Sequence, residues 1–166
     1  MVLGLLAITG CRSAFHVHTE PLTPVTRSDQ SNTFRINGHT LDPEIAMNPT
    51  ARARGLQNRQ PPSDGLILLF PTTVRQSIWM PNCPVDLEAW VIDQQGVILE
   101  IMTLPAERSQ EANESQWEYH ARLPRHRTRN ASRVIWEFKA GSADRMNVVP
   151  GNRIDGNWPA LMVNPG

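Results

Sequence analysis

Short apolar runs, each ended by a proline or by a turn that contains glycine, follow one another along most of this chain. The sequence holds 14 prolines in 166 residues, and proline cannot donate the backbone hydrogen bond that a helix interior or a central strand requires. These prolines argue against a bundle of long helices and for short strands. Short strands at close spacing are typical of an all-β sandwich or barrel. The predicted fold class is therefore mainly β, a compact barrel or sandwich of short strands with one or two short helices.

An Asn-Gly pair at residues 37–38 separates two β-like runs. This pair is the strongest two-residue hairpin signal, because a type I′ turn needs a positive φ at both positions. It predicts a hairpin whose strands cover residues 34–36 and 39–46. Alternating or continuous apolar residues predict further strands between turn signals. These strands are expected at residues 65–70, 77–80, 87–92, 97–104 and 134–139, with a last short strand near 149–154. In the strand 134–139, Val134, Trp136 and Phe138 alternate with Ile135, Glu137 and Lys139, which predicts one apolar face.

Two short helices are expected among these strands. Asn48 suits a helix N-cap and Pro49 suits the first turn, so a helix is predicted from here to about Gly55. Glycine has no Cβ, which permits the positive φ that often ends a helix. A second short helix is predicted near residues 142–146.

Residues 105–132 show neither the apolar periodicity of a helix nor that of a strand, and they exceed the usual length of a loop in a compact domain. They are predicted to form a long polar insertion in the β domain. One interpretation is a mobile surface loop. The other is a lid or binding loop that holds an anionic or sugar-like ligand. Its aromatic and basic residues are Trp117, Tyr119, His120, Arg122, Arg125, Arg127 and Arg129.

The N-terminal residues are similar to the export signal of a bacterial lipoprotein. The apolar run 2–8 is about half as long as a membrane-spanning helix, and it leads into a lipobox-like Ile-Thr-Gly-Cys that ends at Cys11. Residues 1–10 are therefore predicted as a signal peptide and Cys11 as the lipidated N-terminus, although no basic residue precedes it. The alternative is a buried apolar strand or a frayed N-terminus. Arg12 is typical of sorting to the outer membrane in a Gram-negative cell, with the domain facing the periplasm.

Lipidation would place the protein in the cell envelope, with acyl chains as its contact with the membrane. Residues 11–32 are polar, contain prolines and lack an apolar period, which predicts a lipidated tether. The pair His16 and His18 in this tether lacks further ligands and predicts no metal site. A single β domain is expected over residues 33–158, followed by a C-terminal tail over 159–166.

Composition limits the classes of partner and cofactor. The 16 basic and 16 acidic residues cancel, so no global field attracts nucleic acid. If Cys11 is lipidated, Cys83 has no partner for a disulfide bond. Walker, dinucleotide-binding, Cys-x-x-Cys and His-Glu-x-x-His motifs are absent from the sequence, so no cofactor and no metal is predicted.

A series of short motifs occurs in a characteristic order. They cover residues 36–39, 44–46, 52–56 with Arg59, 65–70, 79–82 with Asp86, 93–96, 137–141 and 151–154. Their order and spacing resemble the family known as domain of unknown function 192, over about residues 34–155. The resemblance implies a compact β-barrel or sandwich with a short helix, in proteins that are often secreted or lipid-anchored, and it implies no activity. The chain departs from the family pattern at Pro81, where lysine is usual, and at Cys83, where threonine is common.

The candidate ligand-binding site centres on the proline-flanked segment that begins at Trp79 and Met80. Trp79 could stack on a ligand, while Asn82 and Asp86 orient it. The alternative is that these residues only staple the fold, with Trp79 in the core. Arg59, like Arg52, could bind a carboxylate or phosphate, or could pair with Glu44 or Asp64. The predicted site is thus Trp79, Met80, Asn82, Asp86 and Arg59.

The leading hypothesis is an envelope lipoprotein whose β domain binds a small ligand, a glycan or a partner protein without catalysis. The alternative is a hydrolase or transferase that uses Asp86 or Cys83 with a histidine, either His39 or His120. No catalytic residue is assigned. A third possibility is a purely structural module, which would have no pocket at Trp79.

Overall fold

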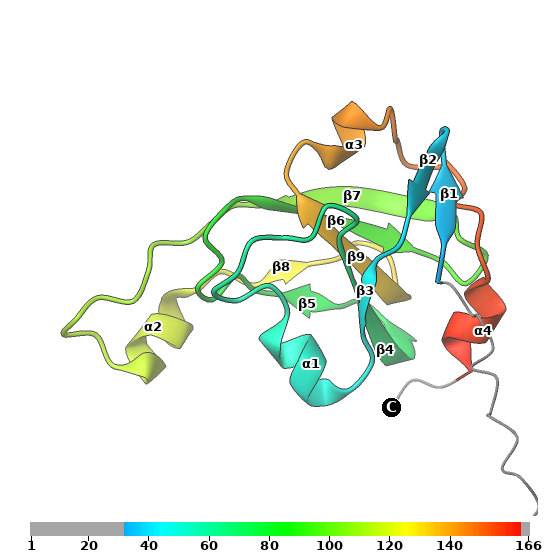
Figure 1. The fold of residues 1–166 in the computed structure, drawn as a ribbon. Coiled ribbons are helices and arrows are strands. Elements are labelled where there is room, and N and C mark those ends of the chain that lie inside the picture. The colour runs from blue at the N-terminus through cyan, green and yellow to red at the C-terminus, as the bar shows by residue number, and fades with distance from the viewer. Residues whose placement is uncertain (1–31, 164–166) are drawn as a thin grey trace, which may run out of the picture. The chain divides into compact units, whose positions relative to one another are not determined.

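A five-stranded mixed sheet organises the domain (Figure 1). The structure is a computed structural model that describes residues 32–163, so the predictions for the signal peptide, for Cys11 and for the tether up to residue 31 lie outside the described residues. The strand order is β3-β4-β9-β6-β7, in which β3 and β4 are parallel and the other pairs antiparallel. These strands are β3 (Glu44–Ala46), β4 (Leu66–Val74), β6 (Leu87–Ile92), β7 (Ile98–Leu104) and β9 (Ser132–Lys139).

Two small ribbons and four short helices complete the described part of the chain. The ribbons are β1 (Phe34–Ile36) with β2 (His39–Leu41), and β5 (Ser77–Ile78) with β8 (His126–Arg127). The helices are α1 (Pro49–Arg54), α2 (Gln116–Arg122), α3 (Ser142–Arg145) and α4 (Trp158–Met162). The mainly β prediction is confirmed. The sheet does not close on itself within residues 32–163, so the layered, sandwich-like arrangement is formed and the barrel is not.

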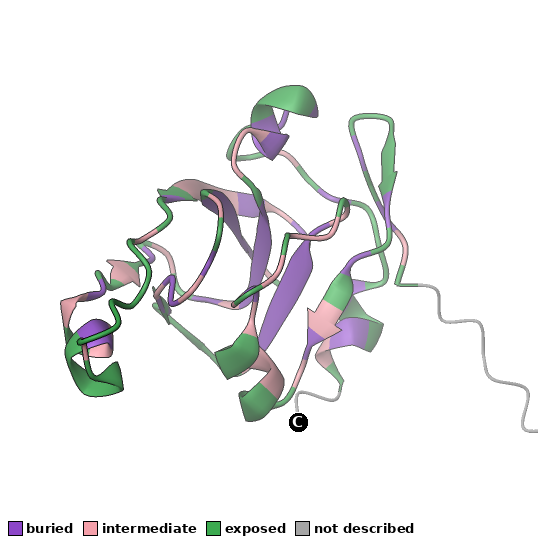
Figure 2. Cartoon of the chain, turned by 60° about the vertical axis from the view of Figure 1, so that its left-hand side comes forward, coloured by how far each residue is buried: buried purple, intermediate pink, exposed green. Residues whose placement is uncertain are grey.

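The central strands of the sheet are buried on both faces, as the purple strands in Figure 2 show. We call the side that carries Trp90, Trp136 and Phe138 the aromatic face; it packs against β1, β2, α3 and α4. We call the opposite side the cavity face. It carries Leu68, Ala89 and Ile135 and packs against β5 and the segments that follow α1 and β5.

The alternation in β9 predicted one apolar face, but both faces of this strand are buried. Val134, Trp136 and Phe138 belong to the aromatic face, as expected. Glu137, which the alternation assigned to the opposite, polar side, is only 4% exposed. The polar side of this strand is therefore covered by protein instead of facing water.

Local turn chemistry was predicted well at the first hairpin and at α1. Asn37 and Gly38 have φ values of 47° and 81°, as a type I′ turn requires. The side chain of Asn48 accepts a hydrogen bond of 2.8 Å from the backbone N–H of Ala51, and the helix ends at Gly55 with φ of 46°. Both elements depend on residues close in sequence, so the sequence signals sufficed.

The predicted strand 39–46 is wrong in its continuity. β2 ends at Leu41, and β3 is a separate strand that pairs in parallel with β4. Pro43 between them has no N–H to donate, and the Asp42 N–H bonds the Asp64 side chain, so the hairpin ladder cannot continue. Similarly, the predicted strand near 149–154 forms only one isolated bridge, between Arg153 and Val97. α4 begins at Trp158, the last residue of the predicted domain, and continues into the stretch predicted as a tail.

The insertion is an ordered structure, which the sequence analysis did not recognise. It contains α2, whose N-terminus has a capping box between Ser115 and Glu118, and β8, which pairs with β5. Arg122 bonds Glu114 at 2.6 Å. Tyr119 is the only buried residue of α2, so the sequence of this helix shows no apolar periodicity. Helical periodicity was therefore too weak a signal for this element.

Candidate functional site

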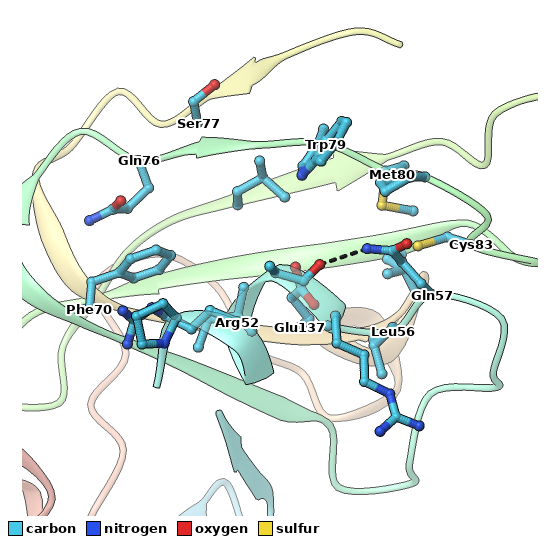
Figure 3. A pocket seen from close by; sticks show the side chains of 18 of the residues that line it. Arg52, Leu56, Gln57, Phe70, Gln76, Ser77, Trp79, Met80, Cys83 and Glu137 are labelled. Atoms are coloured by element: carbon cyan, nitrogen blue, oxygen red, sulfur yellow. Dashed lines mark hydrogen bonds between the residues drawn. The ribbon is translucent and has the colours of Figure 1, made fainter. Parts of the chain in front are cut away.

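A cavity of about 460 Å³ lies on the cavity face, between α1 and strands β4, β5 and β9 (Figure 3). Its volume falls within the usual range for sites that bind small molecules. Apolar side chains form most of its wall, which gives the site the character of a ligand pocket. These side chains are Leu56, Leu68, Phe70, Ile78, Met80 and Leu87.

Glu137 places a carboxyl group among these apolar side chains. The β9 backbone holds the residue between β4 and β6, where it pairs with Leu66 and Ala89. Within residues 32–163 no donor forms a hydrogen bond to this carboxylate, and burial raises the pKa of Glu137 to about 7, while the charge of Arg59 acts in the opposite direction. A carboxyl group with a strongly raised pKa in a cleft is a candidate for function.

The end of α1 leaves space beside this carboxyl group. A Cβ at Gly55 would lie 4.0 Å from Oε2 of Glu137 and 3.6 Å from the backbone oxygen of Arg52. A longer side chain here would enter the space next to the carboxylate, and the positive φ of Gly55 also disfavours one. Gly55 thus both ends the helix and keeps this space open.

The two arginines nearest the cavity are bonded to other groups. Nη1 of Arg52 donates to the backbone oxygens of Met47 and Leu69, the latter at 2.8 Å. Arg59 forms an ion pair of 2.8 Å with Glu44, which confirms one of the alternatives predicted for it. Neither guanidinium hydrogen-bonds Glu137, so the carboxylate has no direct counter-ion among the described residues.

Cys83 lies in the same cavity and is 7% exposed. Burial raises the pKa of its thiol to about 12, and the charge of Glu137 acts in the same direction. The thiol is therefore protonated at neutral pH and is a poor nucleophile. No histidine of residues 32–163 lines the cavity. Cys83 therefore lacks the base that the hydrolase or transferase alternative requires.

Trp79 lies at the edge of the cavity and is partly exposed. The insertion contributes two contacts to its ring: His120 packs edge-on with a centroid distance of 4.8 Å, and the guanidinium of Arg125 lies 4.1 Å from the ring centroid. Met80, the next residue, is 1% exposed and forms part of the cavity wall. Two of the five predicted site residues are thus brought to the cavity.

The other predicted residues lie elsewhere. Asn82 and Arg59 line a neighbouring polar pocket, and the Asn82 N–H donates to the hydroxyl of Tyr119 at 2.7 Å. Asp86 is exposed, and its Oδ1 accepts a hydrogen bond of 2.8 Å from the backbone N–H of Ala106. Asp86 thereby holds the start of the insertion and has no histidine partner in this bond. The predicted set is divided between the cavity, the polar pocket and a structural contact.

With this geometry established, comparison with known proteins gives a family. The sequence pattern of the domain of unknown function 192 family (DUF192, Uncharacterized ACR) matches residues 32–156. The chain belongs to this family. No match was found among the curated proteins.

Two crystal structures are similar to this DUF192 protein. One, from Sinorhizobium meliloti 1021, is described as a proposed transcription regulator; it has 28% sequence identity and a TM-score of 0.58, and the match covers 75% of this chain and 89% of that one. The other is a protein of unknown function from Novosphingobium aromaticivorans DSM 12444, with 19% identity, a TM-score of 0.56, and coverage of 89% and 99%. This second likeness shows the fold alone.

Sequence reasoning missed Glu137 as a site residue of this DUF192 protein. The residue was part of a motif that carried the resemblance, but the strand alternation identified only the opposite face, that of Val134, Trp136 and Phe138, as apolar. The segments that cover it, residues 52–57 and 77–83, lie at least 54 positions away in the sequence. The signal that could have found it is a single acidic residue within a strand that otherwise reads as fully buried.

The described part of the chain provides no evidence for a metal site or for a membrane-spanning helix. No three side chains of histidine, cysteine, aspartate or glutamate are grouped there in a way that could hold a metal ion. No helix in residues 32–163 is both long enough and apolar enough to cross a bilayer.

Proposed function

We propose that this DUF192 protein binds a small, mostly apolar ligand in the cavity beside Glu137, without catalysis. The observation that carries the proposal is a buried carboxyl group without a hydrogen-bond donor in a cavity of about 460 Å³. Burial of such a group is costly unless a partner compensates it. A ligand that contributes a donor would supply that partner and would cover the apolar wall.

A purely structural role explains this arrangement less well. A structural core is close-packed and pairs its buried polar groups, whereas here an open volume lies beside a buried carboxyl group. A catalytic role is also less well supported, because among residues 32–163 the Glu137 carboxyl group is the only group that lines the cavity and is suited to proton transfer near neutral pH. The thiol of Cys83 stays protonated there, and the arginines are bonded to other groups.

Nucleic acid is not the ligand in this proposal. The description of the Sinorhizobium meliloti protein would suggest it, but affinity for nucleic acid depends largely on cationic contacts with phosphate. The formal net charge of this chain is +0, and a small, mostly apolar cavity does not suit a polyanion.

Two substitutions on the same helix test the proposal. Ala53 lines the cavity, whereas Thr50 lines a different pocket beside α1, and both are exposed. We expect Ala53→Trp to fill the cavity mouth and Thr50→Trp to leave it open. The full-length protein and both variants are incubated with a small-molecule extract of the host cell, and retained compounds are measured by mass spectrometry. Retention by the wild type and Thr50→Trp, but not by Ala53→Trp, is expected; equal retention by all three contradicts the proposal.

The proposal also places the ligand site in the cell envelope, on a protein that is anchored to the membrane through Cys11. The lipobox-like sequence before Cys11 supports this anchor. In the native host, a fatty-acid probe should label the wild type, and Cys11→Ala should lose the label. Equal labelling of both proteins, or recovery of a mature protein that still starts at Met1, would refute the anchor.

A further inference from the structure

We propose that the ligand carries an organic cation, an ammonium or amidinium group on an apolar body, and that Glu137 is its counter-ion. This inference rests on the proposed function and specifies the class of ligand. It is carried by the position of one carboxyl group relative to every other charged group at the cavity.

The other buried glutamate of the domain shows how this fold satisfies a structural carboxylate. Glu88, which is 6% exposed, accepts hydrogen bonds from Nε1 of Trp90 at 2.9 Å and from the backbone N–H groups of Gly141 and Ala143 at 2.9 and 2.6 Å. Glu137 is as deeply buried and receives no such bond from residues 32–163. A bound molecule that carries a donor would supply the hydrogen bond that Glu137 lacks among these residues.

The charges around the cavity favour a cation over an anion. The titratable groups that line it besides Glu137 are Arg52, Arg54 and Cys83, and Arg59 acts on Glu137 from the adjoining pocket. Arg52 and Arg59 are engaged with carbonyl groups and with Glu44, and Arg54 is an exposed residue whose charge water screens. An anionic ligand would thus lie beside the Glu137 carboxylate, and only the half-buried guanidinium of Arg52, which backbone oxygens hold through Nη1, could offset the repulsion.

The lining of the cavity suits the rest of such a ligand. Apolar groups on Leu56, Ile78 and Met80 match a hydrocarbon body. Aromatic rings attract cations, and an arginine already lies over each of the two rings at this site, so the counter-ion for a bound cation is Glu137 and not a ring. Arg52 lies 5.4 Å from the ring centroid of Phe70, and Arg125 lies 4.1 Å from that of Trp79.

Affinity for a cation should depend on pH with a defined sign. A cation binds the ionised carboxylate, and burial raises the pKa of Glu137 to about 7. Between pH 8 and pH 6 the ionised fraction falls from about nine-tenths to about one-tenth, while an alkylammonium with a pKa near that of lysine, about 10.4, stays charged. Affinity for the cation should therefore fall about tenfold over this interval.

Three probes with one cyclohexyl body separate charge from apolar contact: cyclohexylmethylammonium, cyclohexylmethanol and cyclohexanecarboxylate. Their binding to the full-length protein is measured by titration calorimetry at pH 8 and pH 6. Hydrogen bonds to charged groups exceed neutral ones by enough to favour the ammonium over the alcohol about tenfold at pH 8. The carboxylate should bind more weakly than the alcohol. Glu137→Gln should abolish the preference for the ammonium over the alcohol and its pH dependence.

The possible results distinguish this inference from the proposed function. If the alcohol and the ammonium both fail to bind, the cavity is not a ligand site and both proposals are refuted. If both bind equally at pH 8, or if Glu137→Gln keeps the preference for the ammonium, the cavity stands and the cation inference is overturned. If Glu137→Gln does not fold, the wild type alone decides, because an affinity for the ammonium that does not change between pH 8 and pH 6 overturns the cation inference.

Discussion

Both faces of the central sheet are buried, yet they differ in how each surrounds a buried glutamate. On the aromatic face Glu88 lies among closely packed rings and receives three hydrogen bonds. On the cavity face Glu137 lies beside an open volume and receives none from the described residues. Packing and satisfied polar groups stabilise a fold, whereas an open volume with an unsatisfied charge weakens it. The difference indicates that the aromatic face serves stability, and it is the basis of our proposal that the cavity face binds a ligand.

The largest effect is expected for Trp136→Ala on the aromatic face. Trp136 is 0% exposed, stacks on Phe138 and donates a hydrogen bond from Nε1 to the backbone oxygen of Asp64. Truncation of such a residue costs about 3–5 kcal/mol of the free energy of unfolding. Denaturant unfolding measures this loss. A loss below about 1 kcal/mol would mean that the aromatic face is not the packed half of the molecule.

The next effect has the opposite sign and concerns Glu137→Gln. The pKa of Glu137 rises from 4.5 to about 7 on folding, so the folded protein binds the proton more tightly than the unfolded chain does. Ionisation of Glu137 should therefore cost the wild type stability as pH rises from about 4.5 to about 7, and this contribution should then level off at about 3 kcal/mol. Glutamine carries no charge, so Glu137→Gln should be more stable than the wild type at pH 8 and close to it at pH 4.

Glu88→Gln is the matched control for that substitution. Glutamine can accept on one side only, and its NH₂ group would face an N–H donor that Glu88 now satisfies. We expect a loss of about 1–3 kcal/mol in the free energy of unfolding. Chemical denaturation of both variants at pH 8 compares the two faces directly. The same sign of change in both variants would remove the distinction between them.

A smaller effect is expected for Trp79→Ala. Trp79 is partly exposed at the edge of the cavity, so its truncation should cost about 1 kcal/mol, well under half of the loss for Trp136→Ala. Thermal unfolding and ligand affinity are measured on the same variant. A loss as large as that of Trp136→Ala would make Trp79 a core residue and would weaken the case for an accessible cavity.

The aromatic face and the cavity face also differ in how far the sequence predicts them. Alternation in β9 identified Trp136 and Phe138 as core residues, because strand geometry alone puts them on one side. The Asn37-Gly38 turn and the Asn48 cap were equally predictable from neighbouring residues. These features need no knowledge of distant segments.

The cavity face was predicted only in part. Trp79 and Met80 were assigned to a site, but the carboxyl group at its centre was not, because distant segments decide that Glu137 is covered. For Asp86 the sequence left a ligand-binding and a structural role open, and its carboxylate accepts a hydrogen bond from the backbone N–H of Ala106. Local patterns do not show which polar side chains a backbone N–H will reach after the chain folds.

The most direct test of this account is the titration of the Glu137 carboxyl group itself. Carbon-13 NMR of glutamate-labelled protein, with Glu137→Gln to assign the signal, follows its ionisation from pH 3 to pH 9. The account predicts a midpoint near pH 7, as burial without a donor requires. It also predicts that cyclohexylmethylammonium lowers this midpoint. A midpoint near the ordinary value of 4.5 would mean that water or a protein donor already satisfies the carboxylate, and it would contradict the central claim.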